Sequence, residues 1–149
     1  MDKNKSAPKL KDIPHIYWIN LDDKEDRRVR TEQMFSYWQV ANTRISAYDG
    51  RDDDLSGIVK GLYPTNITPG EIGCTTSHLK ALKHFLENSD SKYAIIMEDD
   101  CSLDLVHYWN FTWNDFISNE SIEDYLAGND LIENIVENNI NFDNLISKN

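Results

Sequence analysis

The sequence predicts an α/β fold with a mostly parallel sheet, and three observations support this prediction. Short β-prone runs alternate with longer helix-like stretches over the first two thirds of the chain. A strong helix start, with a capping-box pattern and a proline at the first helical position, lies at 68–71. An apolar run at 94–97 leads into three carboxylates at 98–100, which is typical of a strand buried on both faces in the middle of a parallel sheet.

The first strand is expected at 15–21, an apolar and β-prone stretch. Asp22 and Glu25 then have the spacing of a capping box, which predicts a helix that continues to Trp38. Several arginines, among them Arg27, lie in the first turns of this helix. Because cations at a helix N-terminus oppose the helix dipole, these arginines suggest an anionic partner. Ordinary surface arginines, which are common, explain the same pattern.

The second strand is expected at 43–48, followed by a turn at 49–51 and a polar loop up to residue 63. Thr68 then caps a helix that runs to about Asn88. A helical wheel predicts that His78 is buried or nearly so, on the sheet-facing side of the helix, and that His84 is exposed. The wheel places Cys74, Leu79, Leu82, Phe85 and Leu86 on the apolar face, and Lys80, Lys83, His84 and Glu87 on the opposite face.

The three carboxylates at 98–100 repel one another unless a cation holds them. Ligands of open α/β sheets bind beyond the carboxyl ends of the strands, so we expect a site at this edge. Carboxylate oxygens suit Mg²⁺ or Mn²⁺ that also binds substrate phosphates. A solvated acidic turn explains the same three residues equally well. Ser77 and His78 lie in the early half of a helix that should begin at this edge.

Composition narrows the class of protein further. The 149 residues fit one domain, and the net charge of −11 argues against a nucleic-acid partner. We find neither an apolar run of membrane-spanning length nor a signal-peptide pattern, so an intracellular, cytoplasmic location is expected. Cys74 and Cys101 fit no zinc motif by their spacing, and we expect them to be free thiols close to one another.

The expected domain organisation has three parts. A polar lead-in covers 1–12, a single domain covers 13–117, and an acidic, Asn-rich tail covers 118–149. An aromatic-rich patch at 109–117 should pack on the domain. Short helices are expected in the tail at 122–127 and 131–136.

Four sequence blocks together resemble glycosyltransferase family 25, the lipooligosaccharide and procollagen galactosyltransferase-like group. The blocks are Ile19-Asn20-Leu21 followed by Asp26-Arg27, then Ala47-Tyr48-Asp49-Gly50, then Pro69 to Cys74 leading into Ser77-His78-Leu79, and finally Ile96 to Asp100. Their order and spacing agree with the family from about residue 13 to residue 105. Each block alone is weak, whereas four in sequence are specific.

The resemblance implies a Rossmann-like GT-A fold and transfer of galactose or glucose from a UDP-sugar to a hydroxyl acceptor, either a glycan or a hydroxylysine-containing protein. It implies donor-binding roles for Asn20, Leu21, Arg27, Asp49, Ser77, His78 and Asp99. It implies that Glu98 and Asp100 hold Mn²⁺ or Mg²⁺. His78 is the one candidate catalytic residue, and these motifs do not place a general base for the acceptor hydroxyl.

One departure from the family leaves a second function open. Family domains are longer and continue after the acidic motif with an Asp-Trp-Asp type block, which 110–149 lacks. We therefore also consider a C-terminally truncated, catalytically weak paralogue that acts as a nucleotide-sugar-binding module. A metal-dependent phosphotransferase is a third class, but the sequence has no phosphate-cradling glycine-rich loop.

Overall fold

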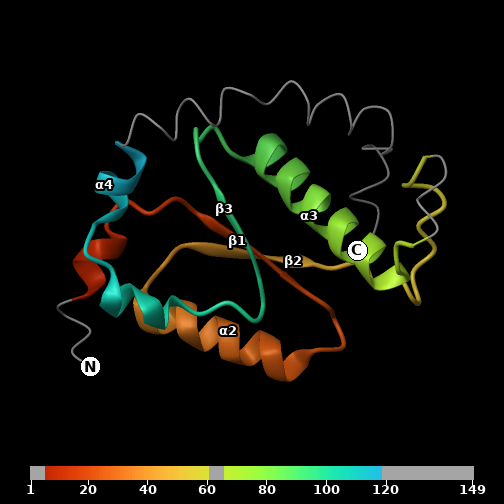
Figure 1. Ribbon diagram of the computed structural model, residues 1–149, viewed down its shortest axis with the longest axis horizontal. Helices are drawn as coiled ribbons and strands as arrows, with labels where there is room; N and C mark the ends of the chain where they lie inside the picture. Colours follow the sequence, from red (N-terminus) through yellow and green to blue (C-terminus); the bar gives the residue numbers. More distant parts are fainter. Residues whose placement is uncertain (1–5, 61–65, 119–149) are drawn as a thin grey trace.

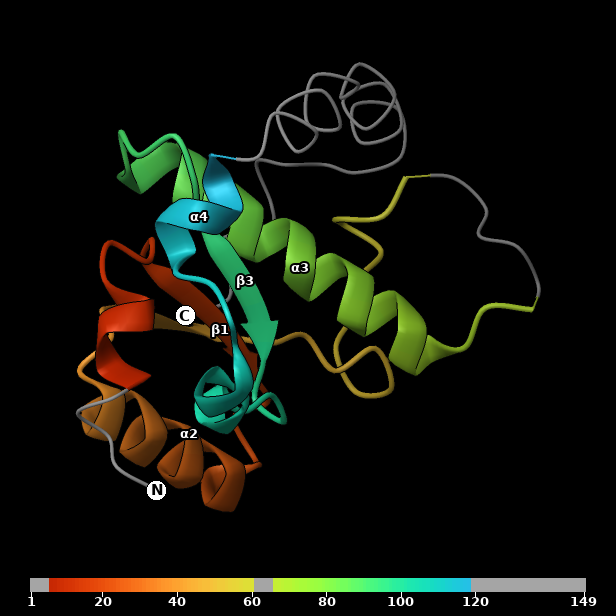
Figure 2. The same ribbon diagram turned by 60° about the vertical axis from the view of Figure 1, so that its left-hand side comes forward.

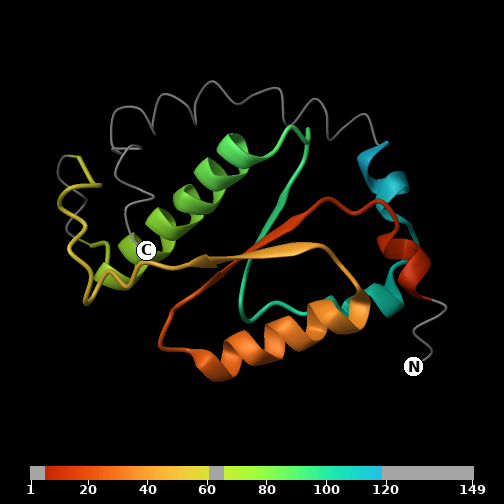
Figure 3. The ribbon, with the colours of Figure 1, turned by 180° about the vertical axis from the view of Figure 1, so that it is seen from behind.

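The structure, a computed structural model, describes residues 6–60 and 66–118 and has an α/β architecture. Its sheet contains β1 (Ile16–Asn20), β2 (Asn42–Ser46) and β3 (Ile95–Glu98), all parallel and ordered β2-β1-β3. Helix α2 (Glu25–Trp38) and helix α3 (Pro69–Asn88) lie on opposite sides of this sheet, as Figures 1 and 3 show. The predicted α/β class with a Rossmann-like, parallel sheet is confirmed.

The central strand β1 is buried on both faces because its side chains alternate between two apolar clusters. Ile16 and Trp18 pack with Phe35 and Trp38 of α2. Tyr17 and Ile19 pack on the other face, in the cluster that contains Ala81 of α3. This alternation is the period of two that a strand imposes on its side chains.

The acidic strand β3 lies at the edge of the sheet, which corrects the expectation that it lies in the middle. Within residues 6–60 and 66–118, β1 is its only strand neighbour, and 95–97 are half-buried. The alternation nevertheless continues along β3. Ile95 and Met97 pack on the α2 side, whereas Ala94 and Ile96 pack on the α3 side.

The capping box predicted for α3 is present. Thr68 accepts a hydrogen bond from the Glu71 backbone N–H, and the Glu71 carboxylate accepts one from the Thr68 backbone N–H. The corresponding prediction for α2 is wrong, because no side chain caps that helix. Asp22 instead accepts hydrogen bonds from Arg44 and from Ser46, at 2.5 and 2.9 Å, so its carboxylate is directed to β2.

The buried face of α3 differs from the one that the helical wheel predicts. Lys80 is 8% exposed, whereas Leu82 is exposed and Leu86 is 72% exposed. The residues that meet the sheet are mostly small: Gly73, Thr76, Ser77, Lys80 and Ala81. Small side chains let the helix approach the strands closely, and they add little to a hydrophobic pattern. His84 is half-buried against Tyr17, so the prediction that it is exposed is wrong. His78 faces the sheet as predicted, where it contacts Glu98 of β3, but it is half-buried rather than buried.

The N-terminal 3₁₀ helix η1 (Ala7–Leu10) packs beside η2 (Leu103–Tyr108), the segment that follows β3 (Figure 2). Leu10 joins the α2-side core, and the Lys9 amine donates to the carbonyl oxygens of three residues, including Val106. Within the predicted polar lead-in, Ser6 and Leu10 are therefore buried, whereas Lys11 and Asp12 are exposed. The short helix α4 (Trp113–Ile117) follows, and Trp109 packs against the core as expected of the aromatic patch.

The helices predicted at 122–127 and 131–136 lie outside the described residues. In 6–60 and 66–118, no helix combines the length and the apolar composition that crossing a membrane requires.

Candidate functional site

A cavity of about 350 Å³ lies at the carboxyl ends of the three strands, against the first turns of α3. This is the edge at which open parallel sheets bind their ligands. Seven of the nine residues predicted for the site line the cavity: Asn20, Leu21, Arg27, Asp49, Ser77, Glu98 and Asp99. The two others, His78 and Asp100, are not among its lining residues.

Asp99 is the anchor of one wall of this cavity. Its carboxylate accepts a hydrogen bond from the Asn20 amide at 2.6 Å and one from the Arg27 guanidinium at 3.1 Å. Its backbone carbonyl accepts from the Thr31 hydroxyl at 3.0 Å. Asp99 is 8% exposed and thus joins the ends of β1 and β3 to the start of α2. The hydrogen bond from Arg27 and the charge of Asp99 raise the pKa of the Arg27 guanidinium.

Asn20 is fully buried and holds three chain segments together. Besides Asp99, its amide nitrogen donates to the Lys24 carbonyl at 3.2 Å, and its amide oxygen accepts from Arg44 Nε at 2.9 Å. Every polar atom of the side chain therefore has a protein partner. In this structure, Asn20 and Asp99 position the cavity wall rather than present unused polar atoms to a ligand.

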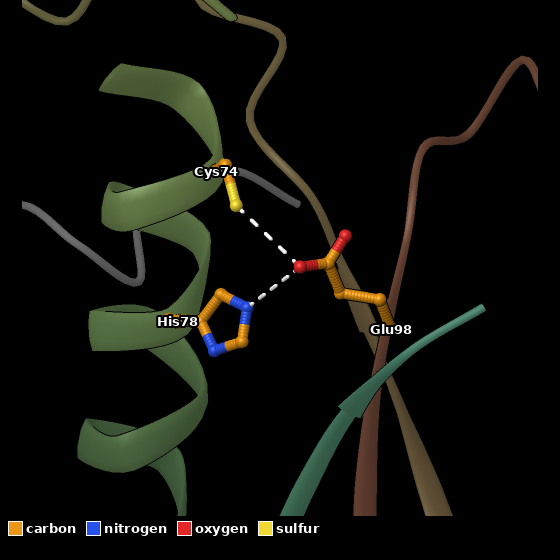
Figure 4. Close-up of side chains that lie close together, drawn as sticks. All are labelled: Cys74, His78 and Glu98. Carbon is orange, nitrogen blue, oxygen red and sulfur yellow. Dashed lines mark hydrogen bonds and ion pairs between the residues drawn. The ribbon is translucent and has the colours of Figure 1, made fainter. Parts of the chain in front are cut away.

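Glu98, one residue earlier, has a different environment. It lies on the α3 side, where its Oε1 atom is 3.2 Å from His78 Nε2 and 3.6 Å from Cys74 Sγ (Figure 4). Its side chain is 49% exposed and that of His78 is 38% exposed. Burial raises the pKa of the Cys74 thiol, and the negative charge of Glu98 and its hydrogen bond raise it further.

The third wall is the turn after β2, which rests on the N-terminal turns of α3. A Cβ atom on Gly50 would lie 1.8 Å from the Pro69 oxygen, and one on Gly73 would lie 2.5 Å from the Gly50 nitrogen. Both positions therefore need glycine for the close approach of the two backbones. The buried Ser77 hydroxyl donates to the Gly73 carbonyl at 2.6 Å and accepts from the Tyr48 N–H at 2.8 Å.

Asp49 in the same turn is held by the next cation along the chain. Its carboxylate accepts hydrogen bonds from the Arg51 side chain at 2.8 and 2.5 Å and from the Arg51 N–H at 3.0 Å. The Arg51 side chain, more than the backbone, lowers the pKa of Asp49 to about 2. Arg51 also lines the cavity, so an ion pair forms this part of its rim.

A second cavity of about 490 Å³ lies on the α2 side and is separate in its lining. Asp100 and Cys101 line it together with residues of α2 such as Tyr37, and Asp99 is the one residue of 6–60 and 66–118 that borders both cavities. The two predicted metal ligands, Glu98 and Asp100, thus line different cavities. Cys74 and Cys101 also line different cavities and are both free thiols.

The comparisons with known proteins agree with this geometry. The family model for glycosyltransferase family 25 (LPS biosynthesis protein) matches residues 13–146. The chain belongs to glycosyltransferase family 25. A "Glycosyltransferase 25 family member" of Drosophila pseudoobscura pseudoobscura is 27% identical over 103 residues. That match covers 62% of this chain and 16% of the relative, and no solved structure matches the chain.

Residues from all four family 25 sequence blocks line this one cavity. The site predicted from the sequence leaves out several residues that line the cavity, among them Lys24, Arg51 and Cys74. Arg51 directly follows the predicted turn, and Cys74 stands four residues before His78 on a helix. The sequence neighbours of Arg51 and Cys74 could therefore have indicated that these two residues belong to the site. Nothing in the sequence distinguishes Lys24 from other surface lysines.

Proposed function

We propose that this family 25 chain binds a UDP-sugar in the 350 Å³ cavity and transfers its galactose or glucose to a hydroxyl acceptor, a glycan or a hydroxylysine-containing protein. The observation that supports this proposal is the convergence of the four family blocks on one cavity at the carboxyl edge of a parallel sheet. Family membership supports the transferase class, and the donor and acceptor are part of the proposal.

Arg27 is the residue that we assign to the diphosphate of the donor. It lines the cavity, and its side chain remains 47% exposed while one nitrogen donates to Asp99. A guanidinium carries five N–H donors in a fork that matches phosphate oxygens. Asp99 therefore fixes the orientation of Arg27 while leaving other N–H groups of the guanidinium unused. These N–H groups can bind the diphosphate of the UDP-sugar.

The divalent metal remains a prediction for this site. Mn²⁺ or Mg²⁺ would offset the charge that develops on the departing diphosphate. Of the acidic motif, Glu98 offers a half-exposed carboxylate to the cavity, Asp99 accepts hydrogen bonds on both oxygens, and Asp100 lines the other cavity. Glu98 and Asp100 do not fit one hard cation as a pair in this arrangement, so we derive no step through the metal.

One observation favours the alternative of a catalytically weak, nucleotide-sugar-binding module. Each carboxylate that lines the cavity already has a partner: Asp49 has Arg51, Asp99 has Arg27 and Asn20, and Glu98 has His78 and Cys74. A general base must reach the acceptor hydroxyl with an available oxygen or nitrogen. In the described part of the chain, Asp49 and Asp99 accept hydrogen bonds on both carboxylate oxygens, whereas the contacts of Glu98 involve Oε1 alone. Two of the three cavity carboxylates therefore cannot act as a base without giving up a contact.

Calorimetric titration with UDP, UDP-galactose and UDP-glucose, with and without Mn²⁺, tests the proposal. Arg27→Ala should weaken UDP binding roughly 10- to 100-fold, the value of one charge-assisted contact. Arg30→Ala is the matched control, because Arg30 lies on the same helix but lines the second cavity. Equal losses in both variants, or none in either, would contradict the assignment.

A transfer assay then separates the two functions. Metal-dependent release of UDP with sugar on the acceptor supports the transferase, whereas tight binding without turnover supports the binding module. Asp100→Ala should abolish any effect of Mn²⁺ on UDP binding if Asp100 takes part in metal binding. If wild type and Asp100→Ala respond identically to Mn²⁺, Asp100 is not a ligand.

A further inference from the structure

We propose that Cys74, His78 and Glu98 form a site for Zn²⁺ or a similar transition-metal ion at the rim of the cavity. Figure 4 shows the three side chains converging, two from α3 and one from the end of β3. The proposal concerns the ion alone. It stands whether or not the cavity binds a UDP-sugar, and it differs in ligands and metal type from the Mn²⁺ or Mg²⁺ predicted at Glu98 and Asp100.

The spacing of the ligand atoms fits a small tetrahedral ion. Zn²⁺ bonds of about 2.0–2.3 Å place neighbouring ligand atoms about 3.3–3.7 Å apart in a tetrahedron. Glu98 Oε1 lies 3.2 Å from His78 Nε2 and 3.6 Å from Cys74 Sγ. All three ligand atoms lie within 4.8 Å of one another. Only small side-chain adjustments are needed to receive the ion.

The backbone explains why these three atoms meet. Cys74 and His78 are four residues apart, so they lie one above the other on one face of α3. Glu98 follows Ile96 by two residues, and Ile96 packs on the α3 side of the sheet. Strand alternation therefore directs Glu98 to the same side. The ligands come from two rigid elements, which fixes their separation before the ion binds.

The chemistry of the donor set selects the metal. A thiolate, an imidazole and a carboxylate are ligands of Zn²⁺, whereas Mg²⁺ prefers oxygen ligands alone. Binding requires the Cys74 thiol to release its proton to solvent, and the divalent charge stabilises the resulting thiolate. Three protein ligands leave one position of a tetrahedral ion for water or for a ligand in the cavity. Cys74 and Glu98 both line that cavity, so the ion would border it.

The three residues are accessible to an incoming ion. Cys74 and Glu98 are exposed and His78 is half-buried. In the structure the thiol donates weakly to Glu98 Oε1, and the same oxygen contacts the imidazole. A plain tether between helix and strand would show the same two contacts, so the experiment has to separate a tether from a metal site.

Titration of the full chain with Co²⁺, followed by visible and near-ultraviolet absorption, makes this separation. The wild type should bind one Co²⁺ with tetrahedral d–d bands and a sulfur-to-cobalt charge-transfer band. Zn²⁺ should displace the cobalt, and excess Mg²⁺ should not. Cys74→Ser should remove the charge-transfer band. Cys74→Ser and His78→Gln should each weaken Zn²⁺ binding by at least about 100-fold, since even residues that only support ligands cost 10- to 100-fold.

The chain supplies matched controls for both variants. Cys101→Ser removes the other thiol, which lines the second cavity, and His84→Gln changes another histidine of α3. Both controls should bind Co²⁺ like the wild type, and circular dichroism should show all variants folded. A wild type without the charge-transfer band overturns the proposal. So does a band that survives Cys74→Ser, or one that is lost in Cys101→Ser.

Discussion

Two neighbouring carboxylates, Glu98 at the end of β3 and Asp99 directly after it, have opposite environments. Asp99 is buried on the α2 side, where Asn20 and Arg27 occupy both of its oxygens. Glu98 is half-exposed on the α3 side, with one oxygen near a thiol and an imidazole. Glu98 is the last residue of β3 and Asp99 is the first residue of the turn that follows, and the chain directs their side chains to different sides of the sheet. An acidic motif can therefore combine an anchor of the fold with a residue available to a ligand.

Replacing each carboxylate in turn is the strongest test of this difference. Asp99→Ala should lower the free energy of unfolding by about 2–4 kcal/mol, because it leaves the buried Asn20 amide and the paired Arg27 without their acceptor. Glu98→Ala should change it by no more than about 0.5 kcal/mol, as expected of an exposed position. Urea unfolding measures both values. Similar losses in the two variants would show that the acids share one structural role.

The glycines that seat α3 beside the strand ends should have the next largest effect. Gly73→Ala should destabilise the protein by about 1–3 kcal/mol, because its Cβ would meet backbone atoms of Tyr48 and Gly50 at 2.7 and 2.5 Å. Gly70→Ala in the same helix is the control. The nearest atom to its Cβ would be 4.0 Å away, so this variant should be neutral or slightly stabilising. Thermal unfolding of the pair checks the contact.

The smallest expected effect concerns the ion pair of Asp49 and Arg51 at the cavity rim. Folding lowers the pKa of Asp49 from 3.8 to about 2, so the pair stabilises the fold above about pH 4, and this stabilisation is lost as the pH falls towards 2. The difference in unfolding free energy between wild type and Asp49→Asn should therefore shrink over this range. The difference between wild type and Arg51→Ala should also shrink as the pH falls over this range. A difference that stays constant with pH would contradict the assignment.

Sequence patterns within a few residues predicted the start of α3, whereas they did not predict the strand order or the face of α3 that packs on the sheet. The start of α3 was predictable because Thr68 and Glu71 form a capping box within four residues and Pro69 occupies the first helical position between them. The place of β3 at the edge was not, because strand order depends on pairings that no single strand encodes. The wheel of α3 also failed, because the helix meets the sheet through small residues such as Ala81 rather than through Leu86.

The same distinction applies to the site. The family blocks predicted seven cavity-lining residues, since blocks at strand ends meet at one edge of a parallel sheet. The spacing of Cys74 and His78 predicts that they share one face of the helix. Their contact with Glu98 depends on how α3 packs on the sheet, which the spacing does not show. Asp100 follows the end of β3, where alternation no longer applies, and it lines the other cavity.

The family match begins at residue 13, but the folded unit begins earlier. Lys9 donates to the backbone of Val106, His107 and Trp109, and Ser6 contacts His107 at 2.6 Å. These contacts join segments about 100 residues apart, so they form only after nearly all of the described chain has been synthesised. A fragment cut at the family boundary would lose the Lys9 amine that donates to the carbonyl groups of Val106, His107 and Trp109. The limits of sequence similarity and of cooperative folding thus differ at this end of the chain.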